Sequence, residues 1–138
     1  MINQFRGKYY FLSNFYLAPV EWNGIKYSNN EAAFQSAKLL SYEHRKQFAH
    51  LDPSAAKQKG RRVKLRHDWE HIKDQIMYEV CFAKFSQNED LKMKLLATGD
   101  QYLEEGNTWG DKEWGTCKGI GQNKLGKILM QIRDELNN

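Results

Sequence analysis

The sequence predicts an α+β fold that is mostly α-helical, with a small antiparallel β element near the N-terminus and about six helices. The β element is indicated by VEWNGIKY (20–27), in which an Asn-Gly dipeptide lies between apolar and aromatic flanks, as in a tight hairpin. The helices are indicated by apolar residues that recur at intervals of three and four. This spacing is clearest in two segments: Trp69, Ile72, Ile76, Val80 and Ala83, and then Leu125, Ile128, Leu129, Ile132 and Leu136.

The first helix should follow the hairpin directly. Ser28 is a candidate N-cap and Glu31 completes a capping-box pattern, which together indicate where this helix begins. We expect it to run to about Leu40. Asp52 and Pro53 are typical of the N-cap and the first position of another helix. The remaining helices are expected at about 43–49, 53–60, 68–85, 88–98 and 122–136.

A chain of 138 residues is expected to form a single domain, 1–138, with a core of its own. No apolar run approaches the ~20 residues that cross a bilayer. The N-terminal segment also lacks the apolar centre of a secretory signal. Cys81 and Cys117 are far apart and form no CxxC motif. We therefore expect a cytoplasmic protein with no disulfide and no membrane contact.

Two further patterns bear on metals and anions. His67 and His71 have the i, i+4 spacing of metal ligands, but the segment lacks a third ligand and the HExxH glutamate, so we expect neither a metal nor a cofactor.

The net charge of +4 and the pI of about 9.0 are compatible with an anionic partner. Six of the thirteen residues in KQKGRRVKLRHDW (57–69) are Lys or Arg. They could contact phosphate, although a solvated basic turn between helices is the commoner explanation.

The first helix carries polar residues where a buried helix would not need them. In YSNNEAAFQSAK (27–38), Glu31, Gln35 and Lys38 fall on one stripe with Phe34, while small or apolar residues cover the rest. If this stripe faces a cleft, its carboxylate and lysine could serve as acid/base and nucleophile. The alternative is that Glu31 only caps its own helix and that Gln35 and Lys38 are solvated.

The segment 106–126 is rich in glycine and tryptophan and has no helical period before its C-terminal end. A glycine-rich loop that enters a helix can present backbone N–H groups to a phosphate, and Lys118 and Lys124 would reinforce this. GIGQNKLG is not the dinucleotide-binding fingerprint, because its third glycine is misplaced and no strand precedes it. Trp109 and Trp114 could stack on a base, or they could pack into the core.

Taken together, these stretches resemble the NADAR superfamily, also called YbiA-like. The matching segments follow the family's order over nearly the whole chain: FLSNF (11–15), YSNNEAAFQSAK (27–38), GRRVKLRHDWEHIKDQIMYEVCFAKF (60–85), LLATGDQYLEE (95–105), WGDKEWG (109–115) and GIGQNKLGKILMQIRDEL (119–136). Residues 30–33 depart from the family's usual helix sequence, but its Glu, Phe, Gln and Lys positions are kept. The loop between Gly115 and Gly121 is short, which could change the substrate preference.

The resemblance implies the YbiA-like fold and an N-glycosidase, which hydrolyses the C–N bond at the anomeric carbon of a ribose. Members of the family act on phosphoribosylamino-pyrimidine intermediates of riboflavin biosynthesis, or on ADP-ribose linked to guanine. The implied substrate is thus a phosphorylated ribosyl small molecule or an ADP-ribosylated nucleic acid. The second case would pair the protein with a DNA ADP-ribosyltransferase toxin.

The family pattern also implies roles for individual residues. Lys38 would attack the ring-opened sugar and form a Schiff base, Glu31 would move protons, and Asp111 would orient water or bind a sugar hydroxyl. Direct attack by water, with Glu31 as base and Lys38 as an electrostatic stabiliser, is equally compatible. The implied substrate-binding residues are Arg6, Gly7, Asn14, Phe15, Phe34, Gln35, Arg62, Trp69, Trp109, Trp114, Gly115, Gly121 and Asn123.

Two non-enzymatic functions are alternatives. The first is a module that binds ADP-ribose or NAD without cleaving it, and the presence of both Glu31 and Lys38 argues against it. The second is a nucleic-acid-binding protein that uses the basic segment 57–69 and needs no pocket.

Overall fold

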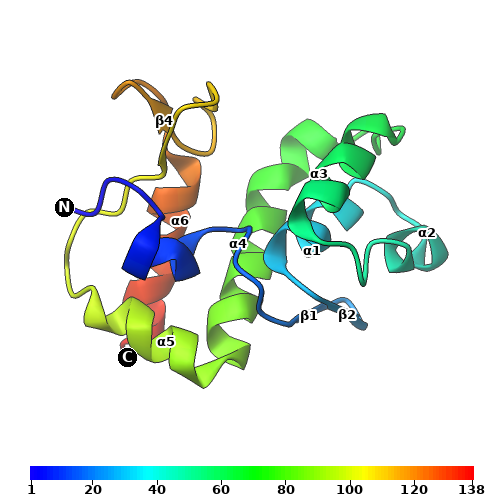
Figure 1. The fold of residues 1–138 in the computed structure, drawn as a ribbon. Coiled ribbons are helices and arrows are strands. Elements are labelled where there is room, and N and C mark those ends of the chain that lie inside the picture. Colours follow the sequence, from blue (N-terminus) through cyan, green and yellow to red (C-terminus); the bar gives the residue numbers. More distant parts are fainter. The chain divides into compact units, whose positions relative to one another are not determined.

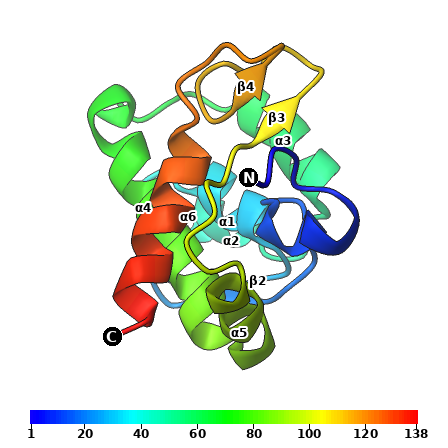
Figure 2. The same ribbon diagram turned by 90° about the vertical axis from the view of Figure 1, so that its left-hand side faces the viewer.

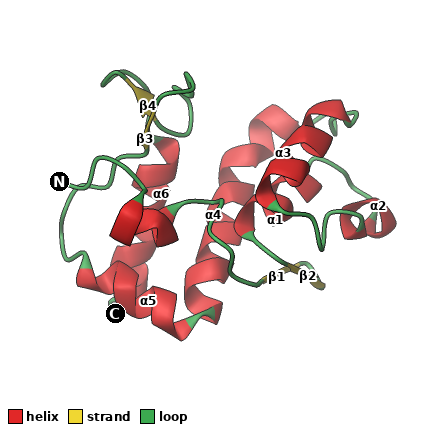
Figure 3. Cartoon of the chain, in the orientation of Figure 1, coloured by secondary structure: helices red, strands yellow, loops and turns green.

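Helices dominate the computed structural model, which describes residues 1–138 (Figure 1, Figure 3). It contains six α-helices, one 3₁₀ helix and two small two-stranded sheets. The chain forms two compact units: unit 1 comprises Met1–Ser13 and Glu89–Asn138, and unit 2 comprises Asn14–Asn88. The predicted class, mostly helical with a small antiparallel β element, is confirmed.

The hairpin of unit 2 forms where the Asn-Gly dipeptide predicts it. Strand β1 (Val20–Trp22) pairs antiparallel with β2 (Ile25–Tyr27). Asn23 and Gly24 have φ angles of 50° and 82°, and a type I′ turn requires positive φ at both central residues. Alternate residues of both strands are buried, so one face of the hairpin belongs to the core of unit 2.

Helix α1 (Asn30–Ser36) does not begin with the predicted capping box. Its N-cap is Asn29, whose Oδ1 accepts a hydrogen bond from the backbone N–H of Ala32 at 2.8 Å. Ser28 is turned away and donates its hydroxyl to the carbonyl oxygen of Ala49. The pairing of Ser28 with Glu31 is therefore wrong, and Glu31 has a different partner.

The C-terminal end of α1 also differs from the prediction. The helix ends at Ser36 and not near Leu40. In the turn that follows, the backbone N–H groups of Ala37, Lys38 and Leu39 donate to carbonyl groups three residues earlier. Such bonds tighten the backbone relative to an α-helix. Lys38 therefore lies in this turn and does not continue the helical stripe.

The other helices lie close to their predicted positions. In unit 2, Asp52 caps α3 through a hydrogen bond from the N–H of Ala55 at 2.8 Å, and Pro53 occupies the first turn, as predicted. Helix α1 packs against both α3 and α4. None of the helices has the length and apolar character needed to span a bilayer. The bounds in unit 2 are α2 (Tyr42–Lys46), α3 (Pro53–Arg62) and α4 (Trp69–Gln87).

Unit 1 combines the N-terminal segment with the C-terminal part of the chain. Ile2 forms a parallel bridge with Leu103, so the N-terminal segment runs beside the chain that leads into β3 (Figure 2). The parallel pair of β3 and β4 and the 3₁₀ helix were not predicted. The elements of unit 1 are the 3₁₀ helix (Gly7–Leu12), α5 (Glu89–Ala97), β3 (Gly106–Asn107), β4 (Thr116–Cys117) and α6 (Lys124–Leu136).

Unit 2 also buries a lysine. Lys84 on α4 is 1% exposed, and its Nζ lies 4.9 Å from the ring centroid of Phe85 and 5.7 Å from that of Tyr16. Burial lowers the pKa of Lys84 to about 8, with Cys81 acting in the opposite direction. Burial also raises the pKa of the Cys81 thiol to about 11. Both groups therefore tend toward their neutral forms.

Candidate active site

Three polar side chains from the first predicted site meet where α1 contacts α3, within unit 2. Gln35 donates from Nε2 to a carboxylate oxygen of Glu31 at 2.7 Å, and each residue is only 7% exposed. Lys38 donates from Nζ to the carbonyl oxygen of Gly60 on α3 at 3.1 Å. Both Gln35 and Lys38 thus contact the backbone around Gly60. The structure brings Glu31, Gln35 and Lys38 together even though Lys38 lies outside the helix.

Gly60 permits this close approach of the two helices. A Cβ atom at this position would overlap Gln35 Oε1 and lie 2.6 Å from Gln35 Cδ. No side chain larger than hydrogen fits there while Gln35 keeps its bond to Glu31. The requirement explains a glycine inside α3, where glycine lowers helix stability by about 0.5–1 kcal/mol relative to alanine.

The Gln35 amide has one atom unsatisfied. Its Oε1 is buried and has no hydrogen-bond partner in the structure. An unsatisfied buried acceptor costs on the order of 1–3 kcal/mol, and such groups are rare in folded proteins. A bound molecule that offers a hydroxyl or N–H group could satisfy this oxygen next to the Glu31 carboxylate.

The turn that carries Lys38 is fixed by two arginines. Arg45 donates from Nε to the carbonyl oxygen of Leu39 at 2.8 Å. The backbone N–H of Arg66 donates to the carbonyl oxygen of Lys38 at 3.0 Å, and the Arg66 guanidinium pairs with Asp68 at 2.6 Å. Sequence reasoning missed both positioning residues, because neither is near Lys38 in the chain and no local pattern marks them.

An aromatic pair borders the cluster. The rings of Phe34 and Trp69 lie 5.3 Å apart between centroids, at an interplanar angle of 53°. Lys38 Nζ lies 5.9 Å from the centroid of Trp69. Both aromatic residues are buried, so the lysine amine faces a largely apolar surface. The predicted residues Phe34 and Trp69 are thus beside Lys38.

The surroundings of Lys38 lower the pKa of its amine. Burial is the largest cause that lowers the pKa of Lys38 below its ordinary value of 10.5, and Arg61 acts in the same direction. The Glu31 carboxylate opposes them by favouring the ammonium form, but the net pKa shift is downward. A lowered pKa increases the fraction of amine that can act as a nucleophile near neutral pH.

The other predicted residues of unit 2 lie around this cluster or support it. Asn14 accepts the backbone N–H of Glu31 at 3.1 Å through its carbonyl oxygen, and its side chain accepts from Asn30 at 2.8 Å. Its polar groups therefore hold the start of α1. The Phe15 ring centroid is 5.8 Å from Lys57 Nζ on α3, and Arg62 is exposed at the end of that helix.

The predicted residues of unit 1 include two whose side chains build the glycine-rich loop itself. Asp111 accepts the backbone N–H groups of Glu113 and Trp114 at 3.0 and 2.9 Å, which closes a local turn. Asn123 is 3% exposed and accepts the N–H of Glu105 at 2.9 Å while donating to Leu103 O at 2.9 Å. These bonds give both side chains a structural role.

Glycines and tryptophans complete the predicted set in unit 1. Trp109 is 56% exposed, so it does not pack into the core, and Trp114 is half-buried with Lys124 Nζ 5.3 Å from its ring centroid. The backbones of Gly115 and Gly121 approach each other too closely for a side chain at Gly121. Gly7 begins the 3₁₀ helix with a φ of 58°, and Arg6 lines a pocket of unit 1.

Comparisons with known proteins show the family and the fold of this chain. A family model described as the NADAR domain matches residues 2–137. The N-glycosidase YbiA of Shigella flexneri is 38% identical over 128 residues, which cover 90% of this chain and 79% of that protein. The riboflavin biosynthesis protein VVA0006 of Vibrio vulnificus is 35% identical over 130 residues, but these cover 91% of this chain and only 35% of that protein.

A solved structure gives the same result for the fold. The NMR structure of the Escherichia coli protein YbiA superposes with a TM-score of 0.85 at 32% sequence identity, over 99% of this chain and 87% of that one. The expected YbiA-like fold is thereby confirmed. With a family model that spans almost every residue, these relationships show that the chain belongs to the NADAR domain family.

Proposed function

We propose that this protein is an N-glycosidase that hydrolyses the bond between the anomeric carbon of a phosphorylated ribosyl group and the nitrogen of a base or amine. The enzyme class is supported by relatives at 38% identity that are named N-glycosidases. The observation that carries the proposal is the cluster in unit 2, where Gln35 holds the Glu31 carboxylate and burial lowers the pKa of Lys38. We further propose that both units are parts of one NADAR domain.

Lys38 is the proposed nucleophile. Its neutral amine attacks the anomeric carbon of the ring-opened sugar, a C–N bond forms to Nζ, and the bond to the base nitrogen breaks. The base nitrogen leaves as an amine after it gains a proton. The Schiff base on Lys38 then adds water, which releases the sugar as an aldehyde and restores the lysine amine. One water molecule is consumed overall.

Glu31 is the proposed proton carrier. It is buried, and the bond from Gln35 fixes the orientation of its carboxylate. In the first half of the reaction it delivers a proton to the leaving nitrogen, and in the second half it removes one from the attacking water. The free Oε1 of Gln35 accepts a hydrogen bond from a substrate hydroxyl beside the reacting carbon.

Direct attack by water uses the same residues in different roles. Glu31 would then activate the water, and protonated Lys38 would stabilise negative charge. The lowered pKa of Lys38 favours the covalent route, because burial disfavours a permanent ammonium group.

The substrate is tested with two compounds: DNA that carries ADP-ribosylated guanosine, and a phosphoribosylamino-pyrimidine intermediate of riboflavin biosynthesis. Each is incubated with the protein, and the products are identified by mass spectrometry. We expect release of a free base or amine from one of them at a rate that depends on Glu31 and Lys38. Tight binding without product, on protein shown to be folded, would instead support a non-catalytic ADP-ribose-binding module.

A further inference from the structure

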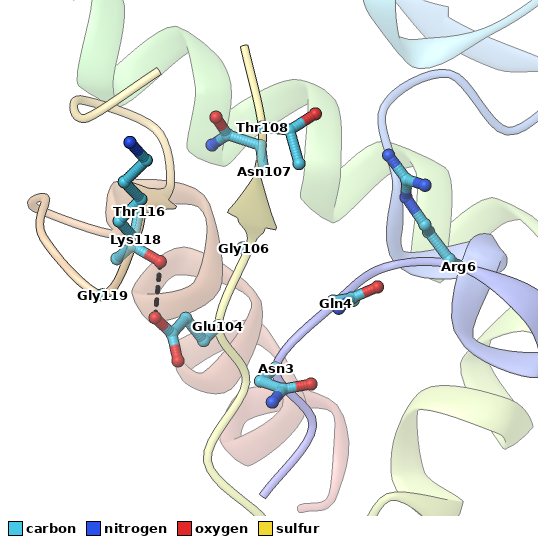
Figure 4. A pocket seen from close by; sticks show the side chains of 10 residues that line it. All are labelled: Asn3, Gln4, Arg6, Glu104, Gly106, Asn107, Thr108, Thr116, Lys118 and Gly119. Atoms are coloured by element: carbon cyan, nitrogen blue, oxygen red, sulfur yellow. Dashed lines mark hydrogen bonds between the residues drawn. The ribbon is translucent and has the colours of Figure 1, made fainter. Parts of the chain in front are cut away.

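Exposed cations are placed differently in the two units. In unit 1, a polar pocket of about 400 Å³ has Arg6 and Lys118 in its lining, on opposite sides of β3 (Figure 4). In unit 2, Arg61 follows Gly60 on α3, and the carbonyl oxygen of Gly60 accepts the hydrogen bond from Lys38 Nζ at 3.1 Å. Of these three cations, Arg61 is therefore the one next to the residue that bonds the proposed nucleophile.

Lys38 Nζ and Arg61 both lie at the C-terminal end of α3. The carbonyl groups in the last turn of a helix have no partner within the helix, and Lys38 satisfies that of Gly60. A neutral amine also donates hydrogen bonds, so this bond does not require a charged lysine. The partial negative charge of a helix C-terminus favours a nearby cation, and Arg61 supplies one there.

The charge of Arg61 is permanent, and no carboxylate of the protein neutralises it. The side chain of Arg61 is exposed and forms no ion pair, and a guanidinium stays protonated throughout the working pH range. Arg66, in contrast, accepts no such freedom, because it donates two hydrogen bonds to Asp68 at 2.6 and 3.0 Å. That pair adds little net charge near Lys38, whereas Arg61 adds a full one.

The other charged groups around Lys38 come from α1 and α2. Burial lowers the pKa of Lys38 most, Glu31 on α1 raises it, and Arg61 on α3 lowers it. Arg45 on α2 is bound to the carbonyl oxygen of Leu39 in the same turn. Arg61 is therefore the charged group that acts on Lys38 in the same direction as burial.

We propose that Arg61 is a positioning residue for the proposed reaction, because its permanent charge opposes a second positive charge on Lys38 and keeps more of that amine neutral. The inference rests on the proposed role of Lys38 as nucleophile. Arg61 does not need to touch the substrate for this effect. At a pH well below the pKa of an amine, the neutral fraction rises about tenfold for each unit by which the pKa falls.

The test measures the amine of Lys38 directly and needs no substrate. Full-length native and variant proteins are labelled with a trace of acetic anhydride between about pH 6 and 11, since only the neutral amine is acetylated. Mass spectrometry of the digested protein gives the labelling of Lys38 relative to an added amine standard, and the midpoint of this labelling in pH gives the pKa of Lys38. Arg61→Gln removes the charge and Arg61→Lys keeps it. Lys26→Gln, at an exposed position of β2, is the matched control for a lost charge.

We expect the midpoint of Lys38 labelling to lie at higher pH in Arg61→Gln than in native protein, and to be native-like in Arg61→Lys and in Lys26→Gln. Salt gives a second readout, because a Debye length of about 3 Å at ~1 M NaCl screens the exposed Arg61 more than the buried Glu31. The native midpoint should therefore rise with salt, and that of Arg61→Gln should not. Loosened packing in Arg61→Gln would also raise its midpoint, but it would not make the native midpoint rise with salt. An unchanged midpoint in Arg61→Gln, or an equal shift in Lys26→Gln, overturns the inference.

Turnover gives the third readout once a cleaved substrate is known. Arg61→Gln should lose turnover near neutral pH and recover it as the pH rises, whereas Arg61→Lys should follow the native pH profile. A native pH profile in Arg61→Gln would overturn the role of Arg61 in the reaction. Failure to cleave either test substrate would instead refute the proposed function, and it would leave the measured midpoint of Lys38 unchanged.

Discussion

Replacement of Gly60 by alanine tests the packing of the candidate active site. In an ordinary helix interior, Gly→Ala would stabilise the protein by about 0.5–1 kcal/mol. Here the new methyl group would overlap the amide of Gln35, which must move away from Glu31. A hydrogen bond to a charged group contributes about 1.5–3 kcal/mol. The two opposing effects leave a net destabilisation of about 0.5–2.5 kcal/mol.

The assay is urea denaturation of four proteins: native, Gly60→Ala, Gln35→Ala and the double variant. With Gln35 shortened to alanine, only its Cβ remains near position 60, at 3.2 Å, so Gly60→Ala should then stabilise the protein by up to about 0.5–1 kcal/mol, as in an ordinary helix interior. The coupling energy between positions 35 and 60 should therefore exceed the loss in the single Gly60→Ala variant and approach the ~1.5–3 kcal/mol of the hydrogen bond to Glu31. If Gly60→Ala raises the free energy of unfolding in the native background, the packing described for Gln35 is wrong.

Three other changes address the cap, the carboxylate and the buried lysine. Asn29→Ala should lower the free energy of unfolding by about 0.5–2 kcal/mol, as measured by urea denaturation, because Asn29 caps α1. Ser28→Ala should lower it less, and a larger loss in Ser28→Ala than in Asn29→Ala would support the capping box instead. Glu31→Gln should melt near the native temperature yet lose most turnover, and native turnover in this variant would exclude Glu31 as proton carrier. The pKa of Lys84 is about 8 when folded and ordinarily 10.5, so the unfolded state binds more protons between these values and native stability should rise with pH there. The difference in the free energy of unfolding between Lys84→Met and native protein should therefore shift in favour of native protein as the pH rises from about 7 to 9; a constant difference would contradict the lowered pKa.

Local signals in the sequence predicted the elements that local interactions determine. The hairpin followed from Asn23-Gly24, because only a few residue types tolerate positive φ at both turn positions. The start of α3 followed from Asp52-Pro53, because aspartate is a good N-cap and the fixed φ of proline suits the first position of a helix. The N-cap of α1 was misassigned because Ser28 and Asn29 are both good caps, and the distant carbonyl of Ala49 takes the hydroxyl of Ser28.

Tertiary contacts explain the features that were not predicted from the sequence. The apolar pattern continues past Ser36, but Arg45 and Arg66 bind the turn that follows, and α1 ends before it. Gly60 was interpreted as a helix end, whereas its function depends on Gln35 in another helix. The pocket of unit 1 joins residues from both ends of the chain: Arg6 was predicted to bind substrate and Lys118 to reinforce phosphate binding, but no local pattern placed them beside the same pocket. The side-chain roles of Asp111 and Asn123 in their loop also required the structure.

The most direct test of the account is to trap the covalent intermediate on Lys38. Sodium borohydride added during turnover reduces a Schiff base to a stable amine, and mass spectrometry of the digested protein then locates the sugar. We predict a sugar adduct on the peptide that contains Lys38, and neither adduct nor product from Lys38→Arg, which keeps the positive charge but cannot form the imine. Turnover without any adduct, together with substantial activity in Lys38→Arg, would contradict the covalent mechanism and support direct attack by water.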